Sequence, residues 1–79
     1  AAPLLQEAGA SSNNTAVGAA LAIGLAAIGS GIAVGIAGAA AIGAIAEKPD
    51  LLGRTLLIVG LAEGIAIYGL IISFMILVR

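Results

Sequence analysis

Apolar residues dominate this chain of 79 residues, and polar residues interrupt them in two places. Residues 1–15 are rich in polar residues and lack helical periodicity; these polar residues are Gln6, Glu7, Ser11, Ser12, Asn13, Asn14 and Thr15. Residues 16–46 contain no charged side chain, a polar break follows at residues 47–50, and residues 51–79 are again mostly apolar. The pattern predicts a polar N-terminal tail followed by two long helices that are joined by a short loop.

Each apolar stretch is long enough to span a membrane, because a helix crosses the hydrocarbon core with about 20 apolar residues. The composition agrees, since 62% of the residues are hydrophobic and 9% are charged, with a mean hydropathy of +1.27. Soluble domains carry about 25% charged residues. We therefore predict an all-α membrane protein with transmembrane helix 1 at residues 16–46 and transmembrane helix 2 at residues 51–79.

The polar break predicts a tight hairpin with both chain termini on one side of the membrane. Pro49 lacks the amide hydrogen that would continue a helix, and it disfavours the α conformation at Lys48. Lys48 lies in the break and Arg54 follows it closely, whereas residues 1–46 contain no basic residue. The positive-inside rule therefore places the loop of residues 47–50 in the cytoplasm. The chain begins without Met, which would fit cleavage of a secretory signal peptide.

The two helices differ in the size of their side chains. The first is mostly Ala and Gly, and a groove of small residues runs along one face: Ala20, Gly24, Ala27, Gly31, Gly35 and Gly38. Small residues let membrane helices approach closely, so we predict helix packing at Gly24, Gly29, Gly31, Gly35 and Gly38. Two kinds of assembly remain open: a homo-oligomeric ring with this helix on the inside, and a glycine-zipper dimer or a simple packed pair of helices.

Glu63 is the acidic residue of the apolar stretches and the candidate functional group. It follows Leu51 by 12 residues, or about 18 Å of helix, near the middle of a core about 30 Å thick. A charge at that depth costs at least a few kcal/mol, and Arg54 lies close to the loop. We expect Glu63 to be protonated at rest and to carry protons; an acid that only packs is the alternative.

The expected register of the hairpin determines which residues surround Glu63. A turn centred beside Pro49 would bring Glu63 level with Val34 of the first helix. Tyr68 is either a hydroxyl partner of Glu63 or an interfacial aromatic residue. Ser30 is expected one turn from the level of Glu63, with its hydroxyl bonded to its own helix.

Several classes of function have no candidate residues. The chain has neither Cys nor His, no cluster of metal ligands and no nucleophile beside a base. It also lacks the basic patch and aromatic platform of a nucleic-acid-binding protein. We predict no metal site, no cofactor and no catalysis by this chain alone.

Three segments together resemble the proteolipid subunit of rotary ATPases, which forms their c-ring: Gly29–Gly35, Ala46–Asp50 and Leu61–Gly69. The resemblance covers about residues 17–79. It implies a ring of hairpins in which the Glu63 carboxylate exchanges an ion against a stator membrane subunit that bears an Arg. It also implies that ring rotation is coupled to ATP synthesis or hydrolysis, and that Lys48, Pro49 and Asp50 face the central stalk.

Departures from the family pattern favour H⁺ over Na⁺ as the transported ion. Members that bind sodium commonly have Gln where Val34 stands and Ser or Thr where Gly64 stands, and Na⁺ needs several oxygen ligands. The remaining oxygens belong to Glu63, to Tyr68 and to a backbone carbonyl such as that of Leu61. The resemblance thus implies a proton site shaped by Val34, Leu61, Gly64 and Tyr68.

The Glu-Lys-Pro-Asp loop favours the V/A type slightly over the F type. The alternative function is a structural or pore-forming glycine-zipper hairpin, which would not need an acid at mid-membrane.

Overall fold

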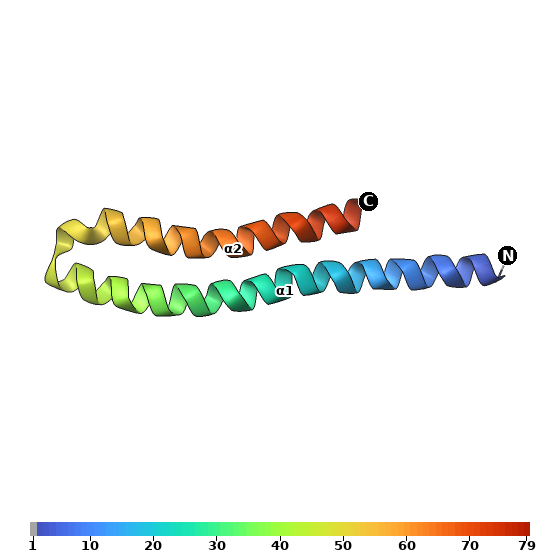
Figure 1. Ribbon diagram of the computed structural model, residues 1–79, viewed down its shortest axis with the longest axis horizontal. Coiled ribbons are helices and arrows are strands. Elements are labelled where there is room, and N and C mark those ends of the chain that lie inside the picture. Colours follow the sequence, from blue (N-terminus) through green and yellow to red (C-terminus); the bar gives the residue numbers. More distant parts are fainter. Residues whose placement is uncertain (1) are drawn as a thin grey trace.

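Two antiparallel helices form a hairpin in the computed structural model, which describes the backbone of residues 2–79 and the side chains of residues 14–79. Helix α1 (Ala2–Glu47) and helix α2 (Leu52–Val78) are joined by the short 3₁₀ helix η1 (Pro49–Leu51) (Figure 1). Both ends of the chain lie opposite the connection, and α1 extends beyond the end of α2. The predicted two-helix hairpin is confirmed.

The first helix begins at Ala2, well before the predicted start at residue 16. The backbone is helical from Ala2, so residues 2–15, which were predicted to form a polar tail before the first helix, continue α1 in the structure. Pro3 lies in the first turn, where its missing amide hydrogen removes no helical bond, and no further Pro occurs before Pro49. Ser and Asn lower helix propensity by only a few tenths of a kcal/mol each, roughly, so they do not end the helix.

The connection between the helices has the local structure that Pro49 demands. Lys48 is extended, with φ −135° and ψ 91°, and its amide donates to the Ala44 carbonyl at 2.8 Å. The Leu51 amide donates to the Lys48 carbonyl at 3.0 Å and closes η1. The predicted break before Pro49 is confirmed. These connecting residues advance by about 3.3 Å (extended) or 2.0 Å (3₁₀) each, against 1.5 Å in an α-helix.

The hairpin is held together by small residues. Ala19, Ala41, Gly69, Ser30 and Ser73 are the residues that become buried within residues 14–79. The helices are in close contact at Gly69, where a Cβ atom would overlap with the Cβ atom of Ala26 and lie 3.1 Å from the Ala22 carbonyl oxygen. Such close backbone contact is how membrane helices associate without a hydrophobic driving force between them.

Large apolar side chains cover the outside of the hairpin instead of filling its interior. Ile36 and Ile42 of α1 are 70% and 73% exposed, and only 11% of the most apolar window of each long helix is buried. The core helices of a soluble protein would be mostly buried. A surface of this kind is stable against lipid or against other membrane helices, and both helices are long enough to span the bilayer.

Replacing Gly69 by Ala is expected to destabilise the hairpin by about 1–3 kcal/mol, the usual cost of overpacking. The added methyl meets Ala26 and the backbone of Ala22, so the helices must separate. Energy transfer between dyes attached at residues 16 and 79, followed during titration with SDS, measures the opening of the hairpin. Gly60→Ala is the matched control, because a Cβ at Gly60 meets nothing within 4 Å. Equal midpoints for the two variants would contradict the close contact at Gly69.

Candidate ion-carrier site

Glu63 lies near the middle of α2 and faces outward. It follows the first residue of the helix, Leu52, by about 17 Å at 1.5 Å per residue. Its side chain is exposed on the surface of the hairpin. The carboxylate is therefore open to lipid or to a neighbouring protein, whereas an acid enclosed between α1 and α2 would not be.

The residue beside Glu63 is attached to α1 by a hydrogen bond. Ser30 Oγ donates to the backbone carbonyl oxygen of Ala62 at 2.8 Å, and Ser30 is only 2% exposed. The prediction that Ser30 bonds to its own helix is wrong. The close approach of the helices at Gly69 and Ala26, one turn away from Ser30 along α1, brings an α2 carbonyl within reach of this hydroxyl. Such interhelical hydrogen bonds contribute roughly 0.6–2 kcal/mol in membranes.

The register of the two helices also differs from the predicted one. The pairs Ser30–Ala62 and Ala26–Gly69 place Glu63 level with Ser30, about one helical turn from Val34. The connection contributes to this difference, because its extended and 3₁₀ residues cover more length than α-helical residues would. Val34 is half-buried and lies nearer to the loop, and its role at the site stays a prediction.

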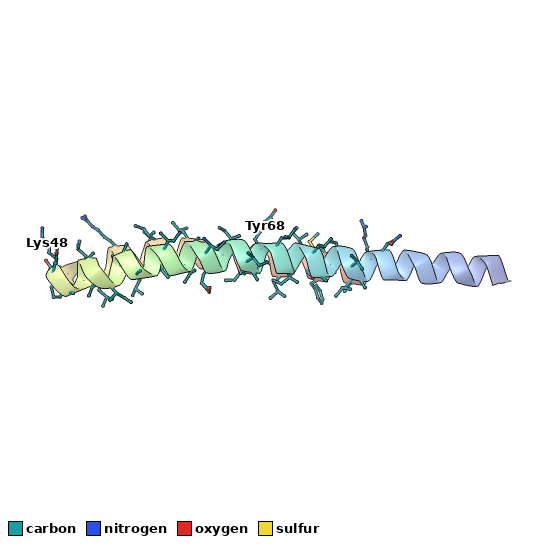
Figure 2. The ribbon with its side chains drawn as sticks, turned by 90° about the horizontal axis from the view of Figure 1, so that it is seen from below. Lys48 and Tyr68 are labelled. Carbon is teal, nitrogen blue, oxygen red and sulfur yellow. The ribbon has the colours of Figure 1, made fainter. Side chains whose placement is uncertain are left out.

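The other predicted site residues of α2 do not surround Glu63 within one chain. Leu61 and Tyr68 are each 68% exposed, and Gly64 is half-buried, with open space where a Cβ would stand. Five residues of helix turn Tyr68 about 140° away from Glu63, and Figure 2 shows Tyr68 pointing away from the helix pair. A contact between Tyr68 and a Glu63 carboxylate would therefore need a second chain.

The predicted packing glycines of α1 do not contact α2. A Cβ atom would meet nothing within 4 Å at any of Gly24, Gly29, Gly31, Gly35 and Gly38. All of them except the half-buried Gly38 are exposed. The hairpin fold gives these positions no reason to be glycine, so their packing role concerns partners outside the chain and stays a prediction.

The polar loop forms one end of the molecule. Lys48, Pro49 and Asp50 are exposed, and Figure 2 shows Lys48 at the extremity of the hairpin. Within the described part of the chain, no group of three or more His, Cys, Asp or Glu could hold a metal ion.

Comparison with known proteins gives a consistent result over most of the chain. Residues 17–76 match the family of the ATP synthase C subunit. The K subunit of the A-type ATP synthase of Sulfolobus acidocaldarius is 52% identical over 61 residues, which are 77% of this chain and 60% of that protein. The c subunit of the ATP synthase of Carboxydothermus hydrogenoformans is 50% identical over 66 residues, 78% of this chain and 80% of the relative.

More distant similarity extends to a third type of rotary enzyme. The c''2 subunit of the V-type proton ATPase of Arabidopsis thaliana is 36% identical over 59 residues, which cover 75% of this chain and 33% of that protein. The match covers 60% of the A-type relative from Sulfolobus acidocaldarius, so the chain spans less than two thirds of the length of that protein. The A-type name agrees with the preference for the V/A type that the loop suggested.

The helical hairpin, its apolar surface and the acid at mid-helix define an integral-membrane proteolipid with two spans. The match over residues 17–76 and the 50% identity to a relative of similar length are more specific. The chain belongs to the ATP synthase C-subunit family.

Proposed function

We propose that this chain is a subunit of the rotor ring of a rotary ATP synthase or ATPase and that Glu63 carries protons across the membrane. The observation that carries the proposal is the position of Glu63, an acid at mid-helix that is exposed on the outer surface of the hairpin. Membership of the ATP synthase C-subunit family supports it. A glycine-zipper hairpin with a purely structural role would need no acid at this depth.

The mechanism follows from the cost of a charge in lipid. A protonated Glu63 is neutral and can face the hydrocarbon, whereas the carboxylate at that depth costs at least a few kcal/mol. Ionisation therefore requires a cation, which an Arg of a stator membrane subunit would supply, because an opposite charge stabilises the carboxylate. Beside this Arg, the carrier releases its proton to one side of the membrane and then takes up a proton from the opposite side. Repeated as the ring turns, these two steps move protons across the membrane.

The exposed glycines support assembly of the chain into a ring of identical hairpins. The small residues of α1 are free for neighbours, and the bulkier α2 carries the acid. Repeating one contact between unlike faces closes into a ring when the rotation per subunit allows it. We place α1 on the inner radius and α2 on the outer, where Glu63 meets the stator.

The orientation in the membrane and the partners follow from the loop. By the positive-inside rule, the loop, which contains Lys48 and is followed by Arg54, lies in the cytoplasm, with both termini on the opposite side of the membrane. Lys48, Pro49 and Asp50 then contact the central stalk, and the A-type names among the relatives favour an enzyme of the V/A type. The chain is then a subunit of a proton-transporting ATPase and no enzyme by itself.

Carbodiimide labelling of Glu63 in membranes tests both the carrier and its ion. We expect labelling to require the protonated acid, to fall as the pH rises and to be unaffected by Na⁺. Na⁺ needs several oxygen ligands, and Val34 and Gly64 offer none through their side chains. Protection by Na⁺ would show that the carried ion is sodium. Absence of labelling at every pH would contradict a carrier role for Glu63.

A further inference from the structure

Ser30 is a buried polar group that the proton-carrier function does not by itself explain. It is 2% exposed and lies in a charge-free part of α1, level with the acid of α2. Its hydroxyl donates to the carbonyl of Ala62, the residue that immediately precedes Glu63. The Ala62 carbonyl and the Glu63 amide belong to the same planar peptide group. The hydrogen bond thus holds the peptide from which the Glu63 side chain projects.

Packing alone does not account for a serine at this position. The other buried residues of α1 among those described are Ala19 and Ala41, which lie eleven residues before and after Ser30. An interval of eleven residues is three helical turns, so the three positions lie on one face of α1. Alanine suffices at both outer positions, and serine occurs where the face meets the carrier segment.

We propose that Ser30 is a positioning residue for Glu63. It acts through Ala62, because its hydrogen bond fixes the depth and the rotation of the carrier segment of α2 against α1. The small residues in contact between the helices, Ala and Gly, resist sliding and rotation only weakly, whereas a hydrogen bond is directional. The proposal rests on the proposed function, since it assigns how the proton-binding acid is held in place.

Loss of the Ser30 hydroxyl is expected to change the proton affinity of Glu63 without removing the acid. When α2 turns or slides by a fraction of a residue, the carboxyl meets a different mixture of lipid, backbone and neighbouring chain. The proton affinity of a group in a membrane depends strongly on these surroundings. A hydroxyl that only filled space would leave this affinity unchanged when replaced by a methyl group.

The test is the pH dependence of carbodiimide labelling of Glu63 in the assembled complex in membrane vesicles. Ser30→Ala is expected to move the pH of half-maximal labelling by about half a unit or more. Thr and Val have the same shape, but Ser30→Thr keeps a hydroxyl, whereas Ser30→Val has a methyl group in its place. The labelling midpoint of Ser30→Thr is therefore expected to lie closer to that of the parent than the midpoint of Ser30→Val does. Ser73→Ala is the matched control, because Ser73 is 6% exposed and no described side-chain hydrogen bond involves it.

The possible results separate this proposal from the proposed function. A parent complex that titrates at Glu63, together with a Ser30→Ala complex that titrates identically, overturns the role of Ser30 alone. Equal shifts in the Thr and Val variants, or an equal shift in Ser73→Ala, also overturn it, because volume or general loosening would then be the cause. A parent complex without pH-dependent labelling overturns the proposed function and, with it, this proposal.

Discussion

Replacing Glu63 by Gln is expected to abolish proton transport driven by ATP, while the assembled complex remains. The amide has nearly the shape of the protonated acid, so the packing around it survives. It cannot release a proton, and no other acid lies within the apolar stretches to replace it. Acidification of membrane vesicles upon ATP addition, together with the amount of complex recovered in mild detergent, measures transport and assembly separately.

Glu47→Gln is the control for this experiment. Glu47 is also exposed, but it lies at the end of α1 beside the polar loop, where water can solvate its charge. We expect this variant to retain proton transport and sensitivity of the complex to carbodiimide. Normal acidification by the Glu63→Gln complex would show that the carrier is a different group.

The two apolar helices, the break between them and the mid-helix position of Glu63 could all be predicted from the sequence, because each depends on a local property. Residues 16–46 contain no charge, so this stretch can enter the hydrocarbon core and is long enough to cross it. Pro49 ends a helix because its ring restricts the backbone and it lacks an amide hydrogen. Glu63 is conspicuous because a charged acid in the middle of a membrane span is costly whichever direction its side chain faces. None of these conclusions requires knowledge of how α1 and α2 contact each other.

The register of the two helices could not be predicted in this way, because it depends on the length that every residue in the connection covers. Extended geometry at Lys48 and 3₁₀ geometry from Pro49 add about 3 Å to the length of the connection, which is part of the shift of about one turn between the predicted and the observed register. That shift decides whether Val34 or Ser30 lies beside the carrier segment. One signal was present: Ser30 is the single hydroxyl of residues 16–46 and shares a helical face with Ala19 and Ala41. The polar residues before Ala16 misled the prediction of where α1 begins, since polarity alone does not break a helix.

Replacing Gly35 by Val is expected to prevent assembly of the ring without unfolding the hairpin. A Cβ at Gly35 meets nothing within 4 Å in the isolated chain, so the fold of α1 against α2 tolerates the larger residue. In the proposed ring, the groove that contains Gly35 contacts a neighbouring chain. An overpacked contact costs about 1–3 kcal/mol, and in a closed ring this cost recurs at every subunit interface. The mass of the assembly in mild detergent is expected to fall to small species, while the helical content measured by circular dichroism is unchanged.

Gly43→Val is the control on the same helix. Gly43 is exposed and equally open in the hairpin, but eight residues beyond Gly35 amount to about two and a quarter turns, which places it on a different face from the groove. We expect Gly43→Val to assemble to a greater extent than Gly35→Val, so that the difference between them measures the groove contact. Full-sized rings from Gly35→Val would show that the groove is not an interface between subunits. Loss of helical content in Gly35→Val would show that the hairpin itself requires glycine at this position, which would contradict the open space around Gly35.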